Sequence, residues 1–355
     1  MPVFPRFKRR INDLPDWPTF RWNHAAVAAA LAAARYAQGR LIGHIEALGS
    51  TVREEAVLRN LTDDVVKSFE IQDESLDADQ VRSSLTRGLG MKVEHLTSID
   101  QRVDGVVKMV LDATLHYDQP LTEERLLGWH AALFPTVAAS TRHIDADSWG
   151  TDSTSPMRQF TEWFNADATT EPVLKAAVAH LWFATIRPFD NGNGRIARAI
   201  ADMALARSEK SSQRFYSMSA QIREKRDDYH RVLEETQRGT LDVTPWMQWF
   251  LGCLTRSLEN AQTNLADVSA RARYWENLRD VPMNKRQRLV INKLLADFEG
   301  KLTTSKWAVM TKSSQDTALR DIQQLVERGV LVRDAAAGRS TAYSLVRIPP
   351  FDSSS

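Results

Sequence analysis

Residues 187–198 read R-P-F-D-N-G-N-G-R-I-A-R and lie between two stretches with the apolar spacing of helices. Pro188 is expected to end the first helix, because proline lacks an amide hydrogen and its ring clashes with the preceding turn. Gly192 and Gly194 permit a tight turn, since they carry no Cβ. The apolar spacing that resumes at Ile196 predicts a second helix. The backbone N–H groups of the loop would therefore lie at the positive end of that helix.

This loop has the composition of an anion-binding pocket. Arg195 and Arg198 lie three residues apart in the first turn of the predicted helix. Guanidinium groups donate paired, charge-assisted hydrogen bonds to phosphate. A phosphate chain therefore fits this combination better than other common ligands do. The alternative is a structural turn with an accidental pair of glycines.

The stretch resembles the signature of the Fic family, H-P-F-x-D/E-G-N-G-R-x-x-R, whose members mostly transfer AMP from ATP to a protein hydroxyl. The resemblance implies a mainly α fold with a Fic-type helical core. It also implies that ATP or another adenine nucleotide binds at Gly192, Asn193, Gly194, Arg195 and Arg198.

Two positions depart from the signature. Arg187 stands where the family has its catalytic histidine, and Asn191 stands at the acidic residue that holds Mg²⁺. Asp190 lies one residue early, so it would hold the metal only after a shift in the register of the loop. We therefore expect the metal site to be weakened.

The change at position 187 removes the implied general base. A guanidinium, with a pKa above about 12, has no lone pair with which to accept a proton near pH 7. General-base help is worth roughly 10²–10⁴-fold in rate. Ordinary transfer of AMP to a protein hydroxyl is thus expected to be lost.

The chain is long enough for several domains. It has 355 residues, of which 43% are hydrophobic, which is enough for two or three domains. The resemblance implies an N-terminal helical domain at 1–95 and a Fic-like domain at 96–280, and the pattern of the last part predicts a winged helix-turn-helix domain at 281–348. No run of about 18 apolar residues occurs, so no membrane partner is expected. The single cysteine, Cys253, lies beside Trp249 and Phe250, which suits a buried thiol in a reducing cytoplasm.

The N-terminal part predicts helices at 24–43, 53–69 and 80–89, with Asp77 as a cap before the third. It resembles the domain of one Fic class that carries an inhibitory motif, S/T-x-x-x-E-G/N. Residues 68–73 read S-F-E-I-Q-D. Ser68 is retained, but Gln72 replaces the glutamate that would pair with Arg198, so this contact should be roughly half as strong. Glu70 and Glu74 are expected to be solvated helix charges.

The Fic-like part predicts helices at 101–115 and 121–133. His130 and His180 lie among apolar neighbours and are expected to be buried core residues. The stretch from Thr136 to Thr170 has no paired β-branched runs and no hairpin turn. In the family a β-hairpin at this place receives the target peptide by strand addition, so the resemblance implies that this clamp is missing.

Aromatic residues follow the signature. Tyr229 lies in a predicted helical surface, and Trp246 opens an aromatic helix that is expected to run to Leu258, followed by a polar helix ending near Asp280. The resemblance places Tyr229 and Trp246 in the parts that cover the adenine. The alternative is that both are core residues.

The last part of the chain is basic. Residues 285–347 hold twelve Lys or Arg and six Asp or Glu, in a chain whose formal net charge is +1. The pattern predicts helices at 287–298, 303–310 and 315–327, capped by Ser313 and by Gly329, and then two strands. In a winged helix-turn-helix, duplex DNA would meet Lys312, Ser314, Gln315, Thr317 and Arg320 in its major groove and Arg333, Arg339 and Ser340 at its phosphates. The alternative is a protein-binding winged helix with a solvated basic face.

Three readings result, and they leave open whether the chain is an enzyme. The first is a nucleotide-binding Fic relative that has lost ordinary AMP transfer and acts as a nucleotide-responsive DNA-binding regulator. The second is a re-purposed nucleotidyl- or phosphoryl-transfer enzyme for a small anionic acceptor, which is already ionised and would be held by Arg187. The third is an ordinary protein adenylyltransferase, which needs a base that the motif lacks.

Overall fold

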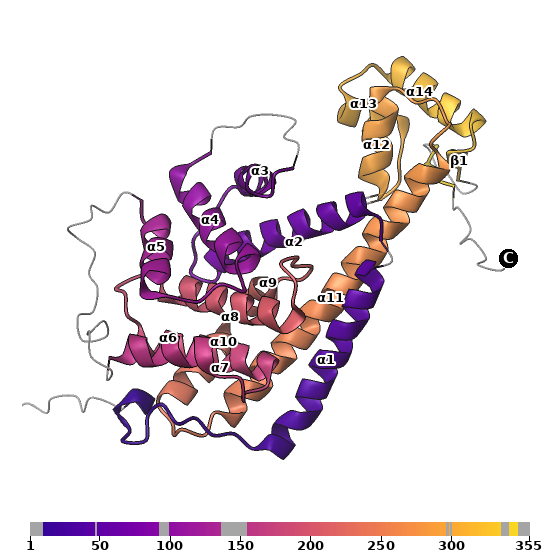
Figure 1. The fold of residues 1–355 in the computed structure, drawn as a ribbon. Helices are drawn as coiled ribbons and strands as arrows, with labels where there is room; N and C mark the ends of the chain where they lie inside the picture. The colour runs from indigo at the N-terminus through magenta and orange to yellow at the C-terminus, as the bar shows by residue number, and fades with distance from the viewer. Residues whose placement is uncertain are drawn as a thin grey trace, which may run out of the picture. The chain divides into compact units, whose positions relative to one another are not determined.

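The computed structural model describes residues 10–46, 48–91, 99–135, 155–295, 298, 300–334 and 341–346. These residues form helices almost throughout, with two short strands (Figure 1), which confirms the mainly α class. A short 3₁₀ helix, Ile11–Asp13, comes first. The α-helices are α1 (His24–Glu46), α2 (Ser50–Glu70), α3 (Ala78–Gly88), α4 (Gln101–Leu115), α5 (Glu123–Leu133), α6 (Pro156–Ala166), α7 (Pro172–Ile186), α8 (Asn193–Glu209), α9 (Met218–Glu224), α10 (Arg226–Gln237), α11 (Thr244–Asn277), α12 (Lys285–Leu295), α13 (Thr304–Thr311) and α14 (Gln315–Glu327).

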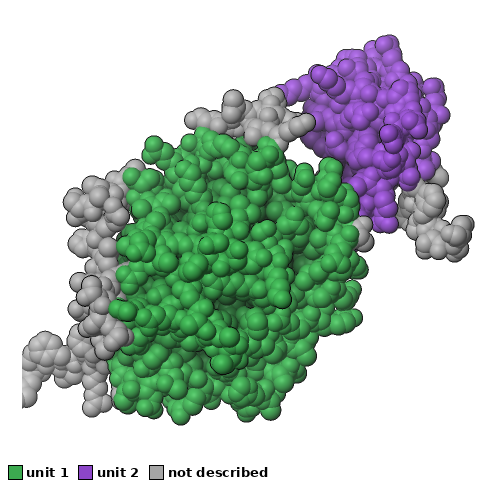
Figure 2. Space-filling view, viewed as in Figure 1, with its two compact units in different colours: residues 1–265 green, residues 266–355 purple. Residues whose placement is uncertain are grey.

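The chain divides into two compact units, residues 1–265 and 266–355 (Figure 2). The division at residues 95 and 280 that the sequence suggested stays a prediction. Among the described residues, no helix is both long enough and apolar enough to cross a bilayer.

Helix α7 forms the centre of the first unit and packs against α8. It is buried on nearly all sides, as expected of a helix that is apolar all round. His180 on this helix is 1% exposed, and His130 on α5 stacks on Phe189 with 4.2 Å between ring centroids. Cys253 is fully buried, and burial raises its pKa to about 12. The predictions that these three residues belong to the core are confirmed.

The predicted helices of the N-terminal and Fic-like parts occur close to their expected bounds, and Asp77 caps α3 by accepting hydrogen bonds from two backbone N–H groups. Three expectations need correction. Helix α6 lies within the stretch 136–170, for which no helix was predicted, and α11 is one helix where two were expected. The cap of α14 is Ser314, whose side chain accepts from the Thr317 N–H group at 3.2 Å, whereas Ser313 hydrogen-bonds Thr311. The stretch 136–170 is where the β-hairpin of the family is expected to be missing, and residues 136–154 of it lie outside the described residues.

The second unit is built from α12, α13 and α14, followed by strands β1 (Leu331–Arg333) and β2 (Tyr343–Leu345). The strands pair antiparallel, with Leu331 opposite Leu345. The core of the second unit contains the fully buried side chains of Val290, Trp307 and Ile322. This order of elements is the order that the sequence predicted, and the winged helix-turn-helix assignment stays a prediction.

Candidate nucleotide site

The loop between α7 and α8 takes its shape from two left-handed residues. Arg187 ends α7 with φ +51°, and its N–H group donates to the Phe183 carbonyl at 3.1 Å. Gly192 caps α8 with φ +81°, a conformation that a residue with a Cβ rarely adopts. A Cβ at this position would also lie 2.9 Å from the ring of Phe134. The loop therefore requires glycine at position 192.

The side chain of Asn193 closes the loop. Its Oδ1 accepts from the Phe189 N–H group at 3.1 Å, and its Nδ2 donates to the Phe189 carbonyl. Asn193 is 6% exposed. Its amide therefore holds the backbone in place, and the contribution of this residue to anion binding would come from its position at the start of α8.

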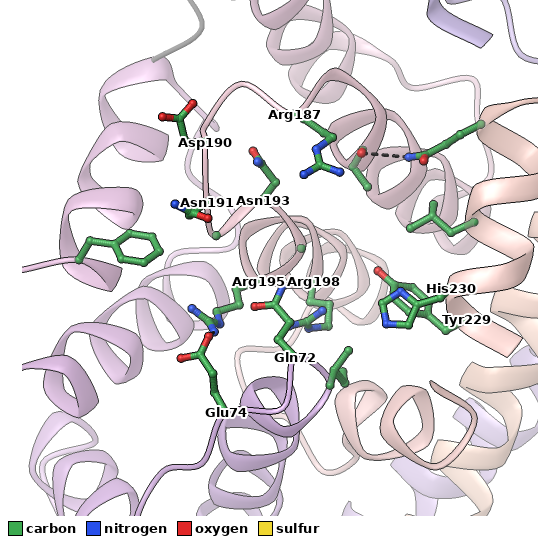
Figure 3. Close-up of a pocket in the computed structure, with 17 residues that line it drawn as sticks. Gln72, Glu74, Arg187, Asp190, Asn191, Asn193, Arg195, Arg198, Tyr229 and His230 are labelled. Atoms are coloured by element: carbon green, nitrogen blue, oxygen red, sulfur yellow. Dashed lines mark hydrogen bonds and ion pairs between the residues drawn. The ribbon is translucent and has the colours of Figure 1, made fainter. Parts of the chain in front are cut away.

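A cavity of about 360 Å³ opens over this loop (Figure 3). It brings together most of the residues that the sequence selected, namely Gln72, Arg187, Asp190, Asn191, Gly192, Asn193, Gly194, Arg195, Arg198 and Tyr229. The side chain of Gln72 lies close to Gly194, since a Cβ at position 194 would be 3.2 Å from Gln72 Nε2. Ser68 and Trp246 are not among the lining residues.

Arg195 is held by contacts from the N-terminal part of the chain. Its guanidinium carbon lies 3.9 Å from the centroid of the Phe69 ring, and its Nη2 pairs with the carboxylate of Glu74. Arg102 on α4 pairs with the other oxygen of the same carboxylate. Burial, together with the charges of Arg198 and Arg102, lowers the pKa of Arg195 to about 10, so it remains charged at neutral pH.

The expectation that Glu74 is a solvated helix charge is therefore wrong. Helix α2 ends at Glu70, and Glu74 lies in the turn beyond it, where the backbone brings its carboxylate against two guanidinium groups. Glu70 stays on the helix and pairs with Lys67 at 2.9 Å. An ion pair with a motif arginine thus exists even though Gln72 replaces the family's glutamate.

Arg198 is buried and is oriented by neutral partners. Its Nε donates to Ser68 Oγ at 2.9 Å, and its Nη2 donates to the Ser68 carbonyl at 2.8 Å. It also donates to the hydroxyl of Tyr229, which lies 3.0 Å from His180 Nε2. The described residues thus give Arg198 partners other than Gln72. Ser68 does not line the cavity itself, and it acts on the site by orienting the Arg198 side chain.

The two aromatic candidates have different surroundings. Tyr229 is buried, but it contributes to the wall of the cavity. Trp246 is fully buried, and its indole N–H donates to the Ala177 carbonyl at 2.8 Å, so its position is that of a core residue.

His230, beside Tyr229 on α10, also lines the cavity and was not selected from the sequence. Burial, and then the charges of Arg226 and Arg198, lower its pKa, so it presents a neutral imidazole at pH 7. The available signal was its place next to Tyr229 on a helix whose other residues are mostly polar.

Asp190 and Asn191 line the cavity and offer one carboxylate and one amide as oxygen ligands. Mg²⁺ is commonly bound by one or two carboxylates together with substrate phosphates. This pair could therefore hold the ion only together with a nucleotide. Across the described ranges, no three His, Cys, Asp or Glu side chains gather as a metal site.

The DNA-contact candidates of the second unit lie on its surface. Lys312, Ser314, Gln315 and Arg320 are exposed at the start of α14, and Thr317 is half-buried. Gln315 donates to Ser305 Oγ at 3.2 Å. Arg333 on β1 is exposed, and Arg339 and Ser340 lie outside the described residues.

The fold and the loop define a Fic-type helical protein. Residues 120–205 match the model of the Fic/DOC family, so this part of the chain is a Fic-type domain, and it is similar to proteins named adenylyltransferases. Residues 11–91 match a model described only as a domain of unknown function, DUF4172.

Two curated relatives are named protein adenylyltransferase Fic. Over 105 residues the chain is 29% identical to the protein from Drosophila yakuba, which corresponds to 29% of this chain and 20% of the relative. It is 30% identical to the protein from Culex quinquefasciatus, with coverage of 29% and 19%. The chain thus spans about a fifth of the length of these relatives.

The likeness of fold extends further. The crystal structure of a Fic family protein from Desulfovibrio desulfuricans superposes with a TM-score of 0.51, at 18% identity. The superposition covers 92% of this chain and 97% of that one. At this identity, the comparison concerns the fold alone.

Proposed function

We propose that the cavity over the 187–198 loop binds the phosphates of an adenine nucleotide, and that ordinary base-catalysed transfer of AMP to a protein hydroxyl is lost. One observation carries this proposal: Arg187 lines the cavity that also holds Arg195 and Arg198. Three guanidinium groups around the start of a 17-residue helix favour a polyanion. None of the three can accept a proton at neutral pH.

The ion pair of Glu74 bears directly on this binding. A phosphate that contacts Arg195 must displace the Glu74 carboxylate or share the guanidinium with it. The turn that carries Glu74 is also anchored by Asp73, which pairs with Arg226 on α10. We therefore expect nucleotide binding to be weaker than the three arginines alone would give, and to depend on this turn.

Calorimetry with ATP, ADP and AMP tests the proposal. We expect binding below millimolar concentrations, weakened at least tenfold in Arg195→Ala, because charge-assisted hydrogen bonds to phosphate would be lost. Incubation of the chain with labelled ATP and a protein lysate should give little transfer of AMP. If no nucleotide binds, the site is a relic. Efficient labelling of lysate proteins would contradict the proposed loss of transfer.

A second candidate function is transfer to a small anionic acceptor. The specific observation is that a cationic side chain, Arg187, lines the cavity at the motif position where the family has its base, and that the neutral His230 lines the same cavity (Figure 3). A carboxylate or phosphate oxygen would attack the α-phosphorus and pyrophosphate would leave, so that no proton need be removed from the acceptor. Incubating the chain with ATP and a panel of carboxylates and phosphates, and assaying pyrophosphate release, separates this candidate from simple binding.

We further propose that the second unit binds duplex DNA, which would make the chain a nucleotide-responsive regulator. Support comes from the excess of six positive charges between residues 285 and 347 and from the exposed polar side chains at the start of α14.

The buried, single thiol of Cys253 supports a reducing, cytoplasmic setting.

A further inference from the structure

A second cavity, of about 280 Å³, lies at the other end of α8 and is separate from the nucleotide site. Its walls come from α1, the first turn of α2, the segment 209–216 that ends α8 and follows it, and α11. Helix α1 runs alongside α11 (Figure 1), and hydrogen bonds between Gln262 and Ala37 and between Gln248 and Ala26 fix this pairing. The volume lies slightly below the roughly 300–1,000 Å³ that is typical of small-molecule sites.

The floor of this second cavity is apolar. Leu41 and Ile45 project from α1, and Phe215 and Leu258 close the opposite side. All four are at most 6% exposed, so they are part of the packed core. An aliphatic chain or a small ring would find contact on both sides here, and removing its surface from water would favour binding.

The carboxylate of Glu209, in the wall of this second cavity, already has hydrogen-bond partners. Glu209 accepts hydrogen bonds from Arg214 at 3.0 Å, from Gln38 at 2.9 Å and from the hydroxyl of Tyr216. Arg214 in turn pairs with Asp202 at 2.8 Å. Because Glu209 already accepts three hydrogen bonds, one of them from a buried guanidinium, it offers a cationic ligand little gain.

The rim of the second cavity carries charged side chains, in contrast to its apolar floor. Arg53 and Lys210 line it together with one acidic residue, Glu46, which gives two positive charges against one negative charge. Within the described ranges, none of the three forms an ion pair with another residue. A ligand that carries an anionic head would therefore find unpaired cations at the mouth, above the apolar floor.

We propose that this second cavity binds a small amphipathic carboxylate, with its apolar tail between Leu41, Ile45 and Leu258 and its carboxylate near Arg53 and Lys210. This site does not depend on the nucleotide proposal, since the two cavities share no lining residue. The size of the cavity limits the ligand to about the length of a medium-chain acid.

The test uses the full chain and three probes with the same eight-carbon tail, octanoate, 1-octanol and octylamine, measured by ligand-observed NMR. We expect octanoate to bind at least fivefold more tightly than the other two. The double variant Arg53→Gln/Lys210→Gln should reduce octanoate to the affinity of 1-octanol, because only the charge contribution is removed. Ile42→Trp, at a rim position that is 39% exposed, should block all three probes by filling the entrance.

Arg59→Gln provides the matched control, because Arg59 is an exposed arginine of the same helix that does not line the cavity. It should leave octanoate binding unchanged. The proposal is overturned if octanoate does not bind at millimolar concentration, if octylamine binds as well as octanoate, or if the double variant behaves like the parent chain. Competition by ATP would assign the bound octanoate to the first cavity and would overturn the proposal equally.

Discussion

Glu74 and Arg195 both line the cavity over the 187–198 loop and form an ion pair, and the Arg195 guanidinium is at the same time stacked on Phe69. Glu74 comes from the turn after α2, and Arg195 comes from the first turn of α8. The carboxylate thus occupies a guanidinium that would otherwise be available to a phosphate.

Glu74→Gln is expected to strengthen ADP binding by about tenfold, which corresponds to about 1.4 kcal/mol. The neutral amide competes less well than a carboxylate for the guanidinium. Calorimetry gives the dissociation constants. Glu70→Gln is the matched control, since Glu70 pairs with Lys67 and lies outside the cavity lining. Equal ADP affinity in Glu74→Gln and the parent chain would show that this ion pair does not oppose binding.

Asn193→Ala is expected to destabilise the first unit by roughly 1–3 kcal/mol, because it removes both side-chain hydrogen bonds to the Phe189 backbone. Thermal or urea unfolding measures this loss, and nucleotide affinity should fall with it. Asn191→Ala, in the exposed part of the same loop, should stay within about 0.5 kcal/mol of the parent chain. Similar losses in the two variants would mean that the Asn193 contacts do not hold the loop.

Arg187→His alone is expected to restore only weak transfer of AMP to protein targets. It supplies an imidazole, whereas Asn191 still stands at the metal position and the ion pair of Glu74 remains. Gel-based detection of labelled proteins after incubation with ATP measures the effect. The double variant Arg187→His/Asn191→Asp should label more than either single variant. Full activity in the single variant would show that the base was the only element lost.

His180 makes the stability of the first unit dependent on pH. Burial, and then the charge of Arg198, lower its folded pKa from 6.5 to about 3. Between these values the unfolded chain binds the extra proton, so the contribution is present above pH 6.5 and is lost as the pH falls, by about 1.4 kcal/mol per unit. Asp202 has the opposite effect on the pH dependence of stability. Burial raises its pKa to about 7, so below this pH the folded chain binds a proton that the unfolded chain does not.

The comparison that isolates His180 is between the parent chain and His180→Gln, since Asp202 is present in both. The difference in unfolding free energy between the two should shrink as the pH is lowered from 7 to 5. Urea unfolding at several pH values measures it. A difference that stays constant over this range would show that His180 is not buried in its neutral form.

Binding of the full chain to duplex DNA should weaken steeply with salt, with a slope near −0.9 for each phosphate neutralised. Arg339→Ala should lower affinity for all sequences alike, whereas Gln315→Ala and Arg320→Ala should relax discrimination between sequences, because side chains at the start of a recognition helix reach base edges. Gel shifts on specific and random duplexes measure both effects. If no complex forms at low salt, the basic face serves a protein partner instead.

The sequence predicted much of the fold because periodicity and caps are local signals. Helices α4 and α14 occur at their predicted bounds, and Asp77 caps α3 as expected. Helix α6 was missed because it is short and follows a long polar stretch, although Pro156 at its first position and the spacing of Met157, Phe160 and Phe164 were available as signals. Helix α11 continues past Leu258 without a break because no glycine or proline occurs between Leu258 and its end at Asn277.

Site residues were predictable where they share one motif and were missed where they come from elsewhere. Arg187, Arg195 and Arg198 of the loop all line the cavity. Glu74 was expected to face solvent because its neighbours in sequence suggested a continuing helix, and only the end of α2 at Glu70 turns its side chain toward Arg195. His230 was missed because a single histidine on a polar helix gives no signal of which wall it will face.

The side chains of Arg195 and Arg198 tie α8 to Ser68, Phe69 and Glu74, which lie more than a hundred residues earlier in the chain. The cavity over the 187–198 loop therefore combines residues from the segment matched at 11–91, from the segment matched at 120–205 and from α10. A fragment that lacked residues 68–74 would leave Arg195 without Phe69 and Glu74, and Arg198 without Ser68. The orientation of both arginines therefore depends on a segment that lies outside the motif.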